Sequence, residues 1–128
     1  MERIVLDASA ILALIGNEPG ADKLTSSLLS RAVASAVNLA EVQTKLVSRG
    51  WTSSQAWEDA TSPVREVVSF DEQQARVAGD LVTQTRHLGL SLGDRACLAL
   101  AVVLGLPAYT AEKAWKKLRF IVPIHIIR

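Results

Sequence analysis

The sequence predicts an α/β domain with a mainly parallel sheet. Short apolar runs alternate along the chain with segments whose apolar residues recur at helical spacing. The first run, residues 4–6, is apolar throughout, which is typical of a central strand buried on both faces. The chain has 128 residues, of which 49% are hydrophobic, so it can bury one substantial core. We therefore expect residues 1–128 to form one domain.

The first half of the chain begins with this strand, and Asp7 stands at its end. A nearly all-apolar helix follows and stops at residues 16–20, where Gly, Asn and Pro break it. A later helix has its apolar residues on one stripe and ends at Gly50. The strands expected here are residues 4–6 and 31–35, and the helices are 8–15, 21–29, 37–49 and 51–61.

The second half contains a helix opened by Asp71, which with Gln74 forms a variant capping box. A further helix begins near Asp94 and ends at Gly105, and it is so apolar that we expect it to be buried nearly all round. Pro123 lies in the last strand and places that strand at a sheet edge. The strands expected here are residues 64–70, 107–110 and 121–127, and the other helices are 71–87 and 111–118.

Charge and cysteine content limit the classes of function. Fourteen basic and thirteen acidic side chains give a net charge of +1, so any contact with nucleic acid must come from a local patch. The single cysteine, Cys97, lies in an apolar run and indicates a buried thiol in a reducing compartment. The sequence shows no secretory signal and no run near the roughly 18 apolar residues of a membrane span. We expect a cytoplasmic protein without a membrane partner.

Four acidic residues occupy positions where a site could form. Asp7 and Glu112 lie at strand-to-helix junctions, Asp94 opens the core helix, and Glu41 lies on a helix beside the sheet. Ligands of open α/β sheets bind outside the carboxyl ends of the strands, so these side chains would converge if the strands are parallel. Each has a structural alternative: a helix cap or dipole partner for three of them, and an ion pair with Lys45 for Glu41. Four acidic residues in such positions are harder to explain as four separate structural roles than as one site.

The chemistry of this acidic set suits a hard cation. Two histidines far apart and one cysteine disfavour a zinc site and a Ser-His-Asp hydrolase. Two carboxylates about 5 Å apart repel by roughly 3 kcal/mol at an effective dielectric constant of 20, which raises a carboxyl pKa and recruits a cation. A hard divalent cation prefers such carboxylate oxygens and can lower the pKa of a water molecule bound to it.

Three stretches, IVLDASAILALIGNEPG, SAVNLAEVQTKLVSRG and LSLGDRACLALAVVLGLPAYTAEKAW, resemble the PIN-domain nucleases, especially the toxins of VapC-type toxin–antitoxin pairs. The likeness spans almost the whole chain. It implies a single PIN-like domain with about five parallel strands flanked by helices, and an acidic pocket that holds Mg²⁺ or Mn²⁺ and hydrolyses RNA. Asp7, Glu41 and Asp94 match the three core acidic positions, whereas Glu112 stands where the family usually has Asp after Thr-Ala.

The resemblance also implies roles for these residues. Asp7 and Asp94 are expected to be the principal metal ligands, Glu41 a ligand or the group that orients the attacking water, and Glu112 an outer or second-metal ligand. Polar and basic neighbours are expected to hold waters or contact phosphates, although a solvated basic face is the alternative for the cations. These neighbours are Ser9, Asn38, Arg95, Lys113, Lys116 and Lys117.

VapC-like toxins pair with an antitoxin, so a VapB-like partner is expected beside the RNA substrate, together with a homodimer. The surface proposed for the antitoxin is an apolar groove, and an arginine or lysine of the antitoxin would reach the acidic pocket. The residues assigned to the groove are the first helix, Leu24, Leu28, Leu29, Trp51 and Trp57.

Two other functions can be weighed against the nuclease. A haloacid-dehalogenase-like phosphohydrolase needs a second Asp two residues after the first, and Ser9 stands there. A non-catalytic PIN-like module that binds RNA or protein stays open because of the departure at Glu112. Metal-dependent RNA cleavage would separate it from the nuclease.

Overall fold

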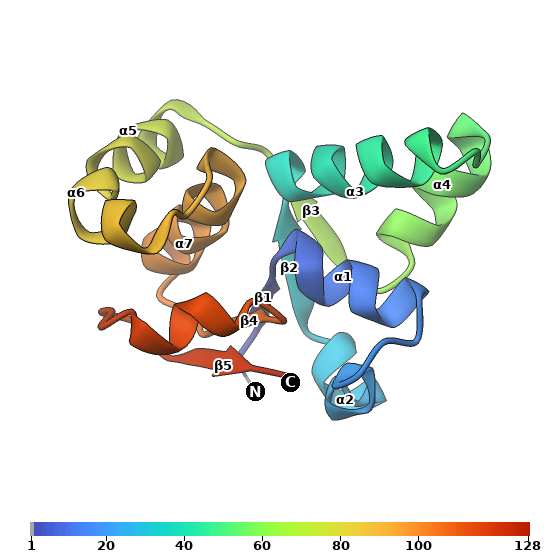
Figure 1. Ribbon diagram of the computed structural model, residues 1–128, viewed down its shortest axis with the longest axis horizontal. Coiled ribbons are helices and arrows are strands. Elements are labelled where there is room, and N and C mark those ends of the chain that lie inside the picture. The colour runs from blue at the N-terminus through green and yellow to red at the C-terminus, as the bar shows by residue number, and fades with distance from the viewer. Residues whose placement is uncertain (1) are drawn as a thin grey trace.

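The computed structural model describes residues 2–128 and contains a five-stranded parallel sheet in the order β3-β2-β1-β4-β5 (Figure 1). Val5 of the central strand pairs with Val33 on one side and Ala108 on the other. The strands are β1 Ile4–Leu6, β2 Ala32–Ser35, β3 Glu66–Val68, β4 Ala108–Thr110 and β5 Ile124–Ile126. The α/β class and the parallel sheet predicted from the sequence are confirmed.

Helices cover both faces of the sheet, with α1, α3 and α4 on one side and α5, α6 and α7 on the other (Figure 1). Side chains alternate across β1, so Ile4 and Leu6 join the core with the first group while Val5 joins the core with α7. The helices are α1 Ala8–Ile15, α2 Ser26–Leu29, α3 Ala36–Ser48, α4 Ser53–Thr61, α5 Glu72–Asp80, α6 Val82–Thr85 and α7 Leu92–Leu104. Short 3₁₀ helices are η1 Ala21–Lys23, η2 Arg86–Leu88 and η3 Lys113–Lys117.

Several predicted helix ends are confirmed by their hydrogen bonds. Asp71 caps α5 by accepting a bond from the Gln74 backbone, although the Gln74 side chain donates to the Ser69 carbonyl rather than closing a capping box. Gly50 and Gly105 adopt the left-handed conformation that ends α3 and α7. Pro123 precedes β5, which lies at a sheet edge as predicted.

Three predicted helices differ in the structure. The segment 21–29 divides into η1 and α2 because Thr25 caps a new helix by accepting a bond from the Leu28 backbone. The segment 71–87 divides after Asp80, and the Thr85 hydroxyl donates to the Leu81 carbonyl near the break. The segment 111–118 is the 3₁₀ helix η3, because the Thr110 hydroxyl accepts a bond from the Glu112 backbone and delays the start.

Burial of α7 is less uniform than predicted. Its residues from 96 to 101 are buried, whereas 102–104 are half-buried. Cys97 is a free, buried thiol, as expected. Within residues 2–128, no helix has both the length and the apolar character needed to cross a membrane.

Candidate active site at the β1–β4 switch point

The strand order reverses between β1 and β4, since the chain places β2 and β3 on one side of β1 and β4 and β5 on the other. Open α/β sheets bind ligands at such a switch point, outside the carboxyl ends of the strands. Asp7 follows β1 directly and is 2% exposed, and Thr110 ends β4 beside it. The candidate site is built around this pair.

Three neighbours donate hydrogen bonds to the Asp7 carboxyl group. Oδ1 lies 2.8 Å from the Ala10 backbone nitrogen, so Asp7 is also the N-cap of α1. The Ser9 hydroxyl lies 2.8 Å from Oδ1 and 2.9 Å from Oδ2, and the Thr110 hydroxyl lies 2.6 Å from Oδ2. The helix-cap interpretation and the site interpretation of Asp7 are therefore compatible.

Burial raises the pKa of Asp7 from 3.8 to about 7. The hydrogen bonds from Thr110, Ala10 and Ser9 lower this pKa, and the negative charge of Asp94 raises it. The donors therefore compensate only part of the lost hydration. A cation beside Asp7 would stabilise the ionised form that burial disfavours.

Ser9 and Thr110 join the end of β1 to the end of β4. The Ser9 hydroxyl lies 2.9 Å from the Ala111 backbone nitrogen, so it accepts a bond from one junction while it donates to Asp7 in the other. Thr110 likewise accepts from the Glu112 nitrogen at 3.0 Å, which leaves its hydroxyl hydrogen for Asp7. Thr110 was not predicted as a site residue, and its sequence signals are its place at the end of a strand and the Thr-Ala pair that precedes Glu112.

Glu41 is half-buried on α3 and has no ion pair with Lys45 among the described residues. Its Oε1 instead accepts a hydrogen bond from Asn38 Nδ2 at 2.9 Å. The same Asn38 nitrogen donates to the Gly93 carbonyl at 3.0 Å, on the first turn of α7. Asn38 therefore connects Glu41 to the helix that carries Asp94.

Asp94 is half-buried in the first turn of α7 and forms a capping box with Ser91. Its Oδ2 accepts a bond from the Ser91 backbone nitrogen at 2.9 Å, and its own backbone nitrogen donates to the Ser91 hydroxyl at 3.1 Å. Asp94 therefore stabilises the start of its helix, which was the structural alternative to a role in a site. Its negative charge nonetheless raises the pKa of Asp7.

The buried Cys97 thiol lies within the electrostatic influence of three of the predicted carboxylates. Burial raises its pKa well above the usual value, and the charges of Asp7, Asp94 and Glu41 raise it further. Within residues 2–128, no three carboxylate, imidazole or thiol groups lie close enough as placed to share a metal ion. The donor set consists of oxygen atoms, which suits a hard cation such as Mg²⁺, and the raised pKa of Asp7 fits such a cation.

The fourth predicted carboxylate lies at the margin of this group. Glu112 is exposed and occupies the N-cap position of η3, but its side chain makes no capping hydrogen bond. Lys113, Lys116 and Lys117 are exposed on η3. Arg95 is half-buried and donates to the Ala78 carbonyl at 2.8 Å, so its guanidinium fastens α7 to α5.

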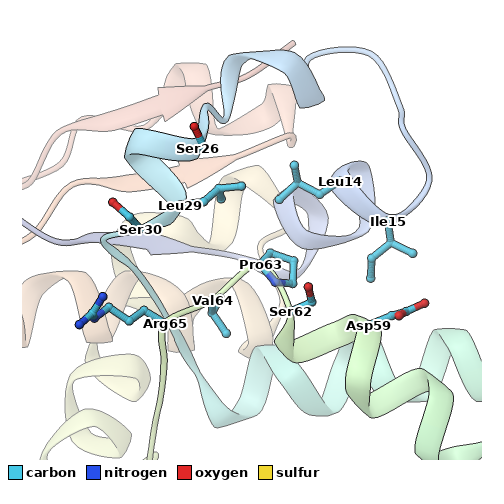
Figure 2. Close-up of a pocket in the computed structure, with 10 residues that line it drawn as sticks. All are labelled: Leu14, Ile15, Ser26, Leu29, Ser30, Asp59, Ser62, Pro63, Val64 and Arg65. Atoms are coloured by element: carbon cyan, nitrogen blue, oxygen red, sulfur yellow. The ribbon is translucent and has the colours of Figure 1, made fainter.

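A separate groove of about 650 Å³ lies beside α1 and α2, as Figure 2 shows. It is lined by Leu14, Ile15, Ser26, Leu29, Ser30, Asp59, Ser62, Pro63, Val64 and Arg65. The prediction that the first helix and Leu29 form a groove is confirmed. The assignment of four other residues to its lining is wrong: Leu24 is buried in the core, Leu28 and Trp51 pack against that core, and Trp57 is exposed elsewhere.

Solved structures of other proteins share the fold of this chain. The chain is similar to VapBC2 from Rickettsia felis bound to a promoter DNA fragment, with 19% identity, coverage of 98% of both chains and a TM-score of 0.74. It is similar to DNA-bound VapBC from Salmonella typhimurium, with 17% identity, coverage of 100% of both chains and a TM-score of 0.75. It is also similar to FitAcB from Neisseria gonorrhoeae, with 18% identity, coverage of 95% of this chain and 96% of that chain, and a TM-score of 0.70.

These identities are low, so the three likenesses establish the fold alone. No curated protein sequence matches the chain. The sequence model of the PIN domain, however, matches residues 4–121 and includes Asp7, Glu41, Asp94 and Glu112. The chain belongs to the PIN-domain family.

Proposed function

We propose that this protein is a metal-dependent endoribonuclease and the toxin of a VapBC-type toxin–antitoxin pair. PIN domains are generally nucleases that use a divalent metal ion. The observation that carries the proposal is the buried Asp7 carboxyl, whose pKa is raised to about 7, at the β1–β4 switch point with Asp94 as its charged neighbour. Such a group in such a place is typical of an active site.

The oxygen ligands for the metal would come from Asp7, Asp94 and Glu41, with Glu112 as an outer ligand. Bound there, Mg²⁺ or Mn²⁺ would lower the pKa of water and neutralise charge on the phosphate. Ser9 and Thr110 hold both oxygens of Asp7 in place, so the carboxylate does not have to reorganise. Glu41 is held through Oε1 and keeps Oε2 for a ligand or for orienting water.

The test is RNA cleavage by the purified protein with Mg²⁺, Mn²⁺ or a chelator. Asp7→Asn should abolish cleavage because the neutral amide no longer attracts the cation. Asp71→Asn is the matched control, since Asp71 caps α5 through the same kind of hydrogen bond but lies outside the site. Cleavage by Asp7→Asn at the unaltered rate would contradict the proposal.

A VapB-like antitoxin is the proposed protein partner. The solved structures similar to this chain include VapBC complexes, and the groove at α1 and α2 offers an apolar floor of leucine, isoleucine, proline and valine side chains. An amphipathic antitoxin helix fits such a groove, and a basic residue beyond it would be attracted to the carboxylates around Asp7. We also propose that the protein is cytoplasmic and forms a homodimer. Sedimentation of the purified protein tests the homodimer.

A non-catalytic PIN-like module is the second candidate. It is favoured by the exposed Glu112 and by the lack, within residues 2–128, of three metal-binding side chains already gathered around one point. This module would bind RNA or antitoxin but leave RNA uncut at every metal concentration. The cleavage assay distinguishes it from the nuclease.

A further inference from the structure

Asn38 joins two helices at the edge of the candidate site. It lies in the first turn of α3 and is 1% exposed. Its Nδ2 donates to Glu41 Oε1 at 2.9 Å and to the Gly93 carbonyl of α7 at 3.0 Å. An amide nitrogen has two hydrogens, so this donor capacity is fully used. If the amide were flipped, its oxygen would face the Glu41 carboxylate and the Gly93 carbonyl, which are both acceptors, and both hydrogen bonds would be lost. The two contacts therefore fix the orientation of the Asn38 side chain.

Gly93 provides the space that this arrangement needs. A Cβ atom at position 93 would overlap the Glu41 carboxylate. The backbone of Gly93 is not in the left-handed region, so conformational freedom does not explain the glycine. Glycine is also among the weakest helix formers, and here it lies in the first turns of α7. The absence of a side chain at position 93 is what leaves room for the Glu41 carboxylate where the structure places it.

From these contacts we propose that Asn38 is a positioning residue, which holds the Glu41 carboxylate against Gly93, one residue before Asp94. The arrangement, here called the Asn38 clasp, consists of Asn38, Glu41 and Gly93. Its role toward a metal rests on the proposed function, whereas the clasp itself does not. It fixes a carboxylate of α3 to the helix that carries Asp94, so two carboxylates from different helices keep a constant separation.

The chemistry of the clasp suits a site that attracts a cation. A lysine or arginine in place of Asn38 would also hold Glu41, but its positive charge would compete with the cation. A neutral amide holds one oxygen and leaves the charge of Glu41 in place. The Asn38 Oδ1 atom is buried and has no hydrogen-bond partner within residues 2–128. No donor in that part of the chain therefore opposes the orientation set by Nδ2.

The first experiment measures stability without metal. Gly93→Ala should change the melting temperature less favourably in the wild-type background, where the new methyl group displaces Glu41, than in a Glu41→Ala background, where the carboxylate is absent. Gly79→Ala is the matched control, since Gly79 lies in α5 with no atom within 4 Å of an added Cβ, and it should have the same effect in both backgrounds. Equal changes from Gly93→Ala in both backgrounds would overturn the clasp.

The second experiment measures Mn²⁺ affinity by calorimetry, without RNA. Asn38→Leu keeps a similar volume but removes the donor, and it should weaken Mn²⁺ binding by about 10- to 100-fold. Gln43→Leu is the control: Gln43 also lies on α3, its Nε2 donates to the Ser53 carbonyl, and its Oε1 is likewise buried without a partner within residues 2–128. Its affinity for Mn²⁺ should equal that of the wild type.

The outcomes separate the clasp from the proposed function. If the wild type binds Mn²⁺ and Asn38→Leu binds it equally well, the positioning role is overturned while the nuclease proposal stands. If the wild type binds no Mn²⁺, the proposed function fails and the metal role of the clasp fails with it. Gly93→Ala provides a second route should Asn38→Leu not fold, because it displaces Glu41 while Asn38 is intact. It should weaken Mn²⁺ binding as well.

Discussion

The Asp7 carboxyl caps a helix and lies at the switch point of the sheet. Its Oδ1 accepts the Ala10 backbone bond that begins α1, and its Oδ2 accepts the bond from Thr110 on β4. Burial opposes ionisation more strongly than these donors favour it, so its pKa rises to about 7. A group that titrates near neutral pH makes both stability and metal binding depend on pH.

The stability of the metal-free protein should therefore fall as the pH rises from about 4 to about 7. Over this range the folded Asp7 keeps a proton that the unfolded chain, with a pKa near 3.8, has lost. Ionisation then favours unfolding, by an amount on the order of 4 kcal/mol above pH 7. Asp7→Asn should flatten this dependence and melt at a higher temperature at pH 8. Melting curves in chelator check this, and identical pH dependence in the two proteins would contradict it.

The Thr110 hydroxyl should set the pH at which the site works. Thr110→Val keeps the shape but removes the bond to Oδ2, so the pKa of Asp7 should rise by about 1. The acid limb of the cleavage rate should move to higher pH by the same amount. Thr110→Ser keeps a hydroxyl and should behave like the wild type. A profile that does not move in Thr110→Val would show that the donor does not control Asp7.

At the scale of the element, the hydrogen bonds at the ends of helices and strands position the carboxylates of Asp94 and Glu112. The capping box of Asp94 and Ser91 fixes the first turn of α7, and Thr110 delays the start of η3 by accepting the Glu112 backbone bond. As a result the Glu112 side chain is exposed at the N-cap position and makes no capping bond. The exposed Glu112 side chain thus has no capping hydrogen bond to lose.

Glu112→Gln should therefore separate function from structure. We expect a change in the free energy of unfolding within about 0.5 kcal/mol, as for an ordinary surface substitution. If Glu112 is an outer ligand, the cleavage rate at limiting Mg²⁺ should fall while the rate at saturating Mg²⁺ recovers. Rates measured across a Mg²⁺ titration decide this. An unaltered titration would leave Glu112 without a catalytic role.

At the scale of the whole molecule, the acidic site and the apolar groove lie in different parts of the fold. The candidate site is assigned to side chains at the ends of β1 and β4 and on α3 and α7. The groove is lined by α1, α2, Asp59 of α4 and the segment after α4 (Figure 2). Substitutions in the groove can therefore alter partner binding without touching the carboxylates.

Leu29→Glu should weaken copurification with the proposed VapB-like antitoxin, because it places a charge on the apolar floor of the groove. RNA cleavage by the isolated variant should be unchanged. Trp57→Ser is the control, since Trp57 is 45% exposed but does not line the groove. Undiminished copurification of Leu29→Glu, in a variant whose fold is verified by circular dichroism, would place the antitoxin elsewhere.

The sequence alone determined the elements with local signals. All five strands, the stops at Gly50 and Gly105, and the parallel sheet follow from apolar runs, glycine conformations and the alternation of strands and helices. These features depend on short stretches of sequence whose physical chemistry is local. That Asp7, Glu41 and Asp94 act together as one site stays a prediction, which follows from their places in the sequence and from the family resemblance.

The tertiary structure decided the contacts that join residues distant in sequence. Thr110 donates to Asp7 across 103 residues, and Asn38 bonds to Gly93 across 55. No periodicity or cap signal encodes such pairs, since they arise only when strands are placed side by side and helices pack across the sheet edge. The same holds for the groove: Leu24 was assigned to its lining from the sequence, but packing buries Leu24 in the core. An apolar side chain buries wherever the fold provides a neighbour, and only the assembled fold specifies which neighbour that is.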